Sequence, residues 1–194
     1  MKRRNPMELR EFALVPFAAP PAPASSAAGG SLARSGSRLA LEMVITGVDA
    51  DAAVATVTGA PRRRDHLWKR TCAELFIAAA GAPGYHELNL APSGDWNLYR
   101  FDGYRAAGRP EDRVTSLSAR IAVEDGRLRM AVELDLVPLG LNGVALEAGI
   151  SAVLESTGGA VSHWALVHPA PVPDFHDRRA FTLRLPAPTS KGRR

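Results

Sequence analysis

Two neighbouring segments of the sequence place carboxylates and an amide at alternate positions beside aromatic rings. Glu74 lies in residues 71–78, and Glu87 and Asn89 lie in residues 85–90. Both segments alternate between a more polar and a more apolar set of residues, which is typical of a half-buried strand. Carboxylates and an amide on one sheet face indicate a site for a neutral polar ligand more readily than a catalytic constellation.

Two tryptophans flank these polar faces in the sequence, and sugars stack their apolar faces on such rings while their hydroxyls need acceptors and amides. The candidate ligand-binding residues are therefore Trp68, Glu74, Glu87, Asn89 and Trp164. In the alternative interpretation both tryptophans are core residues, because tryptophan is highly buried on average. A carboxylate such as Glu74 on an apolar face needs a partner, which either a nearby Arg or Lys or a ligand would supply.

The histidines raise haem or metal binding as a minority alternative. His163, His168 and His176 lie close in the sequence, but they lack the tight spacing that is typical of metal ligands. Haem would need an axial pair such as Met130 with His163. No cofactor is required by the sequence, and no metal ligands are assigned.

The sequence predicts a non-catalytic protein. It contains no G-x-S-x-G, P-loop or G-x-G-x-x-G motif. Cys72 lies in the middle of a predicted strand and is interpreted as a small core residue. A carboxylate-dependent hydrolase stays open as an alternative, because Glu74 and Glu87 could form a hydrolytic pair if they were separated as glycoside cleavage requires.

The composition argues against nucleic acid as a partner. The chain has 194 residues and a formal net charge of +4, but six of its 24 basic residues lie at the two ends, so the body is slightly acidic. A basic face on the folded domain could come only from residues 62–64 with Lys69 and Arg70. The partner that the sequence predicts is a small molecule, and it does not predict the oligomeric state.

The sequence predicts a cytoplasmic protein without a membrane segment. A single cysteine excludes an internal disulfide, which suits a reducing compartment. Near the N-terminus, Glu8, Arg10 and Glu11 interrupt the apolar run that a signal peptide would need. No apolar stretch approaches the length of a membrane span.

Many short alternating segments and no amphipathic helix of ten or more residues predict an all-β fold, a two-sheet antiparallel β-sandwich of jelly-roll or immunoglobulin-like type. Asp125-Gly126 predicts a two-residue hairpin turn. The predicted organisation is a flexible tail at 1–8, a single domain at 9–186 with a Pro/Ala/Gly-rich loop at 18–30, and a basic tail at 187–194. Besides the two segments above, strands are predicted at 11–17, 38–46, 54–58, 116–124, 127–136, 144–155, 161–167 and 181–185.

Three runs of sequence resemble the bacterial DOMON-like proteins, which are themselves similar to family 9 carbohydrate-binding modules. The first run is DHLWKRTCAELF, which starts at Asp65. The second is YHELNLAPSGDW, which starts at Tyr85, and the third starts at Ser162 with SHWAL. The resemblance covers most of residues 38–185 and implies an antiparallel β-sandwich with a ligand site on one face.

The resemblance also implies roles for particular residues. In the sugar-binding relatives two tryptophans clamp the sugar and a Glu follows the first along the next strand; Trp68, Trp164 and Glu74 fit these places. Asn89 fits an Asn of the neighbouring strand, whereas Glu87 stands where the relatives have Arg. Other DOMON relatives bind haem, but the residues for that are not evident in this sequence.

Overall fold

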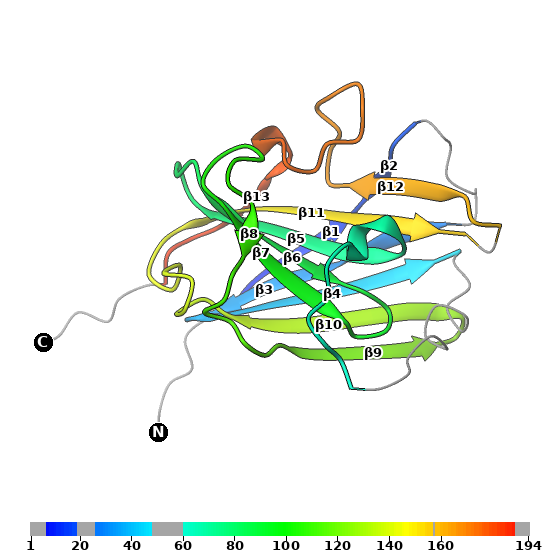
Figure 1. Ribbon diagram of the computed structural model, residues 1–194, viewed down its shortest axis with the longest axis horizontal. Helices are drawn as coiled ribbons and strands as arrows, with labels where there is room; N and C mark the ends of the chain where they lie inside the picture. Colours follow the sequence, from blue (N-terminus) through cyan, green and yellow to red (C-terminus); the bar gives the residue numbers. More distant parts are fainter. Residues whose placement is uncertain (1–6, 19–25, 48–59, 157, 189–194) are drawn as a thin grey trace, which may run out of the picture.

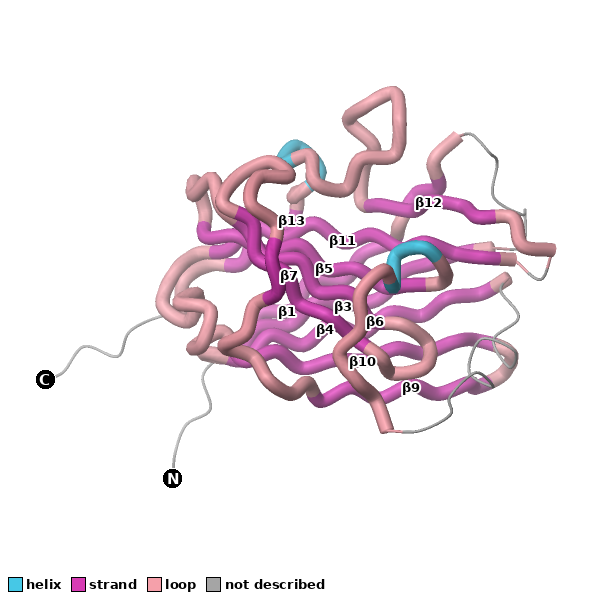
Figure 2. Tube along the Cα trace, in the orientation of Figure 1, coloured by secondary structure: helices cyan, strands magenta, loops and turns pink. Residues whose placement is uncertain are grey.

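The structure is a computed structural model that describes residues 7–18, 26–47, 60–156 and 158–188. These residues form two antiparallel sheets packed as a sandwich (Figure 1). Helical structure within the described residues is limited to two short 3-10 turns, η1 (Leu67–Lys69) and η2 (Arg178–Ala180), which Figure 2 shows in cyan. The predicted fold class is therefore confirmed.

The first sheet has the strand order β1-β3-β4-β10-β9. Its strands are β1 (Glu8–Ala13), β3 (Ala27–Ser35), β4 (Arg38–Thr46), β10 (Arg127–Asp135) and β9 (Ser118–Glu124). The hairpin between β9 and β10 turns at Asp125 and Gly126, which have φ angles of 52° and 69°. The turn predicted at this dipeptide is confirmed, because both of its central residues need positive φ.

The second sheet has the strand order β2-β12-β11-β5-β6-β7-β8, and β13 also pairs with β11. Its strands are β2 (Val15–Pro16), β12 (Val161–Ala165), β11 (Leu146–Glu155), β5 (Cys72–Ala79), β6 (Tyr85–Leu90), β7 (Trp96–Phe101), β8 (Arg109–Pro110) and β13 (Leu183–Leu185). The two segments that carry Glu74 and Glu87 are thus adjacent strands, β5 and β6.

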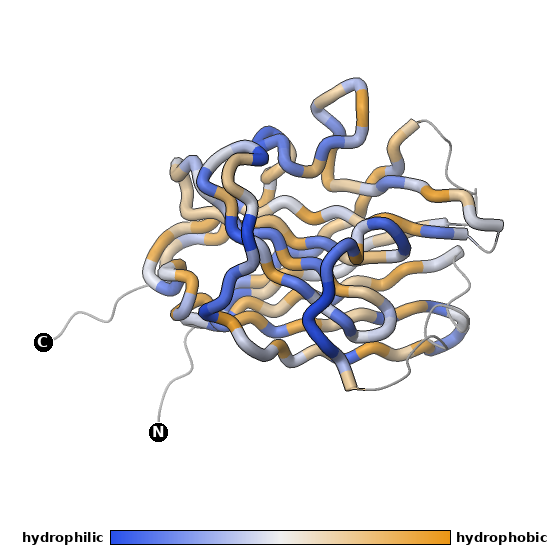
Figure 3. Tube along the Cα trace, viewed as in Figure 1, coloured by the Kyte–Doolittle hydropathy of each residue, from blue (hydrophilic) through white to orange (hydrophobic). Residues whose placement is uncertain are grey.

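The hydrophobic core lies between the two sheets. Met43 of β4, Ile77 of β5 and Leu88 of β6 are each almost completely buried there. Apolar residues recur along the strands of both sheets in Figure 3, whereas the segment that leads into η1 is hydrophilic. Because side chains alternate along a strand, the residues between these core positions in β5 and β6 face outward, away from the first sheet.

The predicted first strand at 11–17 is wrong in its extent. The chain forms β1, which pairs with β3 in the first sheet, and then β2, which pairs with β12 in the second sheet. Leu14, between them, is buried in the core. A chain that crosses from one sheet to the other cannot continue as a single strand, so the segment divides at this residue.

The predicted loop at 18–30 is wrong at its C-terminal end, because β3 begins at Ala27. This part of the sequence has no bulky apolar alternation, and the strand forms through its ladders with β1 and β4. A Cβ atom at Gly30 would lie 1.9 Å from the carbonyl oxygen of Glu42, so only glycine fits this position. Glu8 of the predicted tail belongs to β1, and the predicted strand 54–58 lies outside the described residues.

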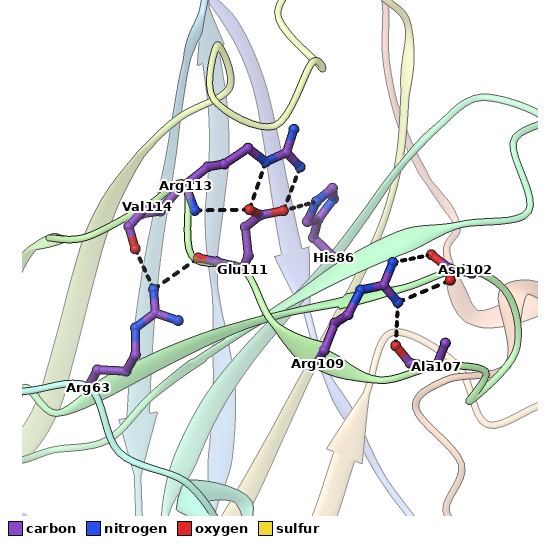
Figure 4. Close-up of polar contacts among 8 residues, drawn as sticks. All are labelled: Arg63, His86, Asp102, Ala107, Arg109, Glu111, Arg113 and Val114. Atoms are coloured by element: carbon purple, nitrogen blue, oxygen red, sulfur yellow. Dashed lines mark hydrogen bonds and ion pairs between the residues drawn. The ribbon is translucent and has the colours of Figure 1, made fainter.

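A network of charged residues holds the segment that follows β8 against the second sheet (Figure 4). The buried Glu111 carboxylate accepts hydrogen bonds from Arg113 Nε at 2.7 Å and Nη2 at 2.6 Å. His86 Nε2 lies 3.3 Å from Glu111 Oε2, so this buried histidine takes part in the same network. The guanidinium of Arg63 donates to the main-chain oxygens of Glu111 and Val114.

Replacing Glu111 with Gln is expected to destabilise the fold by about 2 kcal/mol at neutral pH. Hydrogen bonds from Arg113 hold the pKa of Glu111 at about 2, below that of the unfolded chain. The ionised Glu111 carboxylate therefore stabilises the fold fully above about pH 4.3, the pKa of a glutamate in the unfolded chain. This contribution is lost as the pH falls toward 2. Urea unfolding at a series of pH values should show the two proteins converging in acid. A constant difference between them across the series would contradict this account.

Candidate functional site

A cavity of about 460 Å³ lies on the outer face of the second sheet. Its floor comes from outward-facing residues of β5, β6, β7, β11 and β12, the alternates of the core residues in the same strands. Its sides come from η1 and from two loops, one after β7 and one after β12. The site is thus built where an outward polar sheet face is surrounded by three irregular segments.

Two buried carboxylates form the polar part of the floor. Glu74 is 2% exposed and Glu87 is 5% exposed. Ser151 Oγ donates to Glu74 Oε2 at 2.7 Å, and Asn89 Nδ2 donates to Glu87 Oε1 at 2.7 Å. Within the described part of the chain, no hydrogen bond reaches Oε1 of Glu74 or Oε2 of Glu87, and no Arg or Lys forms an ion pair with either residue.

The two carboxylates hold protons more tightly than ordinary glutamates. Burial, reinforced by the nearby Glu87, raises the pKa of Glu74 to about 8, although the Ser151 hydrogen bond opposes the shift. Burial also raises the pKa of Glu87, against the hydrogen bond from Asn89. Desolvation disfavours the charged form of an acid. Two neighbouring carboxyl groups also resist being ionised at the same time, because their negative charges repel each other. The pair therefore retains a proton at neutral pH.

Aromatic side chains make up much of the cavity wall. Trp68, on η1, is 37% exposed and meets the ring of Tyr99 edge to face, with centroids 5.8 Å apart. The Tyr99 hydroxyl donates to Asp65 Oδ1 at 2.7 Å, which fixes this ring relative to the segment before η1. Phe101 and Phe175 also line the cavity. Such rings offer flat apolar surfaces beside the polar floor.

The loop after β12 brings His176 over the floor. Arg105 N donates to the Tyr85 hydroxyl at 3.2 Å, and that hydroxyl lies 2.7 Å from His176 Nδ1. We assign the Tyr85 hydroxyl hydrogen to Nδ1, because this arrangement satisfies the donor and the acceptor of the hydroxyl and leaves the hydrogen of neutral His176 on Nε2. Burial lowers the pKa of His176 to about 4, and its Nε2 lies 3.7 Å from Glu87 Oε2. This N–H is therefore directed toward the floor without a close partner there.

An ion pair joins the two loops at the rim. Arg105 Nη2 lies 2.9 Å from Asp174 Oδ1, and the Tyr104 hydroxyl donates to Asp174 Oδ2 at 2.6 Å. The Arg105 side chain is 52% exposed, whereas that of Asp174 is 13% exposed. The guanidinium therefore sits at the solvent side of the cavity, where a carboxylate of the opposite loop already balances its charge.

The structure brings four of the five predicted site residues together. Trp68, Glu74 and Glu87 line the cavity, and Asn89 lies fully buried beside them, hydrogen-bonded to Glu87. Trp164 is 4% exposed and packs in the core between the sheets.

The predicted pair of tryptophans on either side of a ligand is therefore wrong: Trp68 lines the cavity and Trp164 does not. In β12 the outward position belongs to His163, so Trp164 points inward, and its Nε1 donates to Ser162 Oγ at 2.9 Å. Adjacent residues of a strand face opposite ways, and a one-residue difference in register moves an indole from the site to the core.

Several cavity residues were not anticipated from the sequence. Tyr99 is paired with Glu87 across β6 and β7, so the alternation of both strands could have identified it. Arg105, Phe175 and His176 come from irregular loops whose sequences show no periodicity. The position of such residues depends on tertiary contacts, such as the Arg105–Asp174 ion pair, and not on a local pattern.

The structure separates the residues that were considered for haem or metal binding. Met130 lies in the core on the first sheet, whereas His163 faces outward from the second sheet into the cavity. Within residues 7–18, 26–47, 60–156 and 158–188, no three His, Cys, Asp or Glu residues are grouped so as to hold a metal ion. The same part of the chain also contains no helix that is long and apolar enough to span a membrane.

Comparisons with known proteins show what the chain is similar to in structure. No family model and no curated protein matches the sequence. A structure described as a "putative carbohydrate-binding protein" from Bacteroides uniformis ATCC 8492 aligns with a TM-score of 0.67 at 12% identity, over 90% of this chain and 84% of that chain. This alignment shows a shared sandwich fold.

Two structures of a family 9 carbohydrate-binding module from Caldicellulosiruptor kristjanssonii align less closely. The complex with cellotriose gives a TM-score of 0.47 at 10% identity, covering 81% of this chain and 72% of that chain. The complex with glucose gives 0.45 at 11% identity, covering 75% and 69%. The resemblance to DOMON-like proteins stays a prediction from the sequence.

Proposed function

We propose that this chain is a non-catalytic ligand-binding β-sandwich that takes a saccharide or a similar polar small molecule into the cavity on its second sheet. The observation that carries the proposal is the pair of buried carboxylates, Glu74 and Glu87, each with an oxygen that no described residue hydrogen-bonds, beneath aromatic walls. A buried polar group without a partner costs free energy, and a ligand in the cavity would remove that cost.

The chemistry of the cavity suits a sugar in three respects. Ligand sites for small molecules commonly have volumes of about 300–1,000 Å³, and this cavity has about 460 Å³. The free carboxylate oxygens can accept hydrogen bonds from sugar hydroxyls, and the N–H of His176 can donate one. Trp68 and Tyr99 offer ring surfaces for the apolar C–H face of a sugar. The fold shared with the Bacteroides protein is consistent with this proposal.

A carboxylate-dependent hydrolase is the second candidate, because Glu74 and Glu87 titrate as a coupled pair. Their register argues for binding instead. Glu74 pairs with Asn89 and Phe76 pairs with Glu87, so the two carboxylates are diagonal neighbours on one sheet face, both below a bound ligand. Glycoside hydrolysis needs carboxyl groups that flank the scissile bond. Steady turnover of a saccharide substrate that Glu74→Gln abolishes would favour the hydrolase.

Truncation of the rim tryptophan tests the binding site. Trp68→Ala is expected to weaken the affinity for a bound saccharide by about tenfold, because a stacked ring is lost from the wall. The measurement is calorimetric titration with a panel of neutral mono- and disaccharides. Leu9→Ala, an exposed apolar truncation on β1 of the first sheet, serves as the control and should leave the affinity unchanged. Binding that Trp68→Ala leaves intact would place the ligand elsewhere.

A further inference from the structure

We propose that the ligand of this cavity carries a protonated amine, so that an amino sugar is preferred to its neutral parent sugar. This inference rests on the proposed saccharide function and specifies the chemical class of the ligand. Two buried carboxylates at the floor lack a cation of their own, and an ammonium group would supply one. Three features of the cavity favour an amine: the charges around the floor, the free carboxylate oxygens and the aromatic wall.

Among the described lining residues, the Arg105 guanidinium is the positive charge that acts on the floor: its attraction lowers the pKa of Glu87 without overcoming the effect of burial, and it forms no ion pair with Glu74 or Glu87. His163 and His176 line the cavity, and burial lowers the pKa of each, so both are neutral near pH 7. The guanidinium of Arg105 is the basic group among the described lining residues, and it pairs with Asp174 at the rim. Tyr99 and Cys72, on neighbouring outward positions, have raised pKa values through burial and remain protonated.

The free oxygens are placed to receive an ammonium group. Oε1 of Glu74 and Oε2 of Glu87 accept no hydrogen bond from a described residue, and both side chains are more than nine-tenths buried. An ammonium has three donors and no acceptor, so it can donate to both of these oxygens once the pair has released its proton. A neutral hydroxyl would leave the charge of an ionised carboxylate unbalanced, whereas an ammonium neutralises it.

The wall strengthens the same preference. The faces of aromatic rings carry negative potential and attract cations within about 6 Å of their centroids. Trp68, Tyr99 and Phe175 surround the space above the two carboxylates. A neutral sugar would gain only the stacking contribution of these rings, whereas a protonated amino sugar would gain stacking and charge attraction together.

Binding of an ammonium should expel a proton from the pair. An opposite charge close to a carboxyl favours its ionised form, and Glu74 has a pKa of about 8 in the free protein. At about pH 6 the pair holds a proton in the free protein and gives it to the buffer when the ammonium binds. Above about pH 8 Glu74 is increasingly ionised in the free protein, so less proton is released on binding.

The experiment is calorimetric titration of the full chain at about pH 6, where amino-sugar amines are protonated. The probes are glucosamine, galactosamine and mannosamine, their neutral parents glucose, galactose and mannose, and cyclohexylamine as a ring amine without hydroxyls. We expect at least one amino sugar to bind about tenfold or more tightly than its parent. We also expect its binding heat to change with the ionisation enthalpy of the buffer, in the sense of proton release.

Variants of the two carboxylates assign the preference to the floor. Glu74→Gln and Glu87→Gln each keep the size of the side chain and are expected to remove most of the amino-sugar preference. Glu42→Gln is the control: Glu42 is an exposed residue of β4 in the first sheet, paired with Arg129 at 3.3 Å. The comparison among probes on the unmodified protein stands even where a variant fails to fold.

The outcomes separate the two proposals. If the parent sugars bind as tightly as the amino sugars, the amine inference is overturned while the saccharide function holds. If cyclohexylamine binds as tightly as the amino sugars and the neutral sugars do not bind, the amine inference holds and the saccharide function fails. If none of the seven probes binds, both are overturned.

Discussion

Trp164→Ala is expected to lower the free energy of unfolding by about 3–5 kcal/mol. Its indole is 4% exposed in the core between the sheets, so truncation leaves a void there and removes the hydrogen bond from Nε1 to Ser162 Oγ. The measurement is urea unfolding followed by far-UV circular dichroism. The matched variant Trp68→Ala removes the same side chain from a site that is 37% exposed and should change the stability by less than about 1 kcal/mol.

The contrast between the two variants is the informative result. We expect Trp164→Ala to affect the stability of the fold and Trp68→Ala to affect ligand affinity. Equal losses of stability in the two variants would contradict the placement of Trp68 on the cavity rim and of Trp164 in the core.

Glu74→Gln is expected to stabilise the fold at alkaline pH by an amount on the order of 3 kcal/mol. The pKa of Glu74 is about 8 in the folded protein, above its value of about 4.3 in the unfolded chain. The folded protein therefore binds more protons than the unfolded chain between these values. Its stability accordingly falls as the pH rises from about 4.3 to about 8, and the uncharged glutamine removes this dependence.

Thermal unfolding between about pH 5 and pH 9 measures this effect. The curves of the two proteins should diverge as the pH rises, with Glu74→Gln the more stable at the alkaline end. Glu42→Gln, on the exposed face of β4, should follow the unmodified protein throughout. A Glu74→Gln protein that is less stable than the unmodified protein at about pH 9 would show that the carboxylate is well compensated in the fold.

The alternation of residues predicted much of this fold and part of the site. It identified β5 and β6 and assigned Glu74, Glu87 and Asn89 to one face, which the structure places outward on the second sheet. The sequence left open whether a basic residue compensates Glu74. The structure answers that question for the described residues, where the partner of Glu74 is the Ser151 hydroxyl.

Other features depend on tertiary contacts that no local pattern records. Residues 27–35 form a strand through pairing with β1 and β4, although their small side chains give no apolar alternation. In β12 the sequence predicts Trp164 as a ligand-binding residue, but the register of the strand turns His163 toward the cavity and Trp164 into the core. Phe175 and His176 reach the cavity only because their loop folds back over the sheet and is held by Asp174.

The indole N–H resonances of the three tryptophans give the most direct test of the cavity as the binding site. Trp68 lies at the cavity rim, whereas Trp96 and Trp164 are buried in the core. When the isotopically labelled protein is titrated with a saccharide that binds, the Trp68 resonance should shift and the other two should stay in place. A shift confined to Trp96 or Trp164, or binding that moves none of the three, would contradict a site on the outer face of the second sheet.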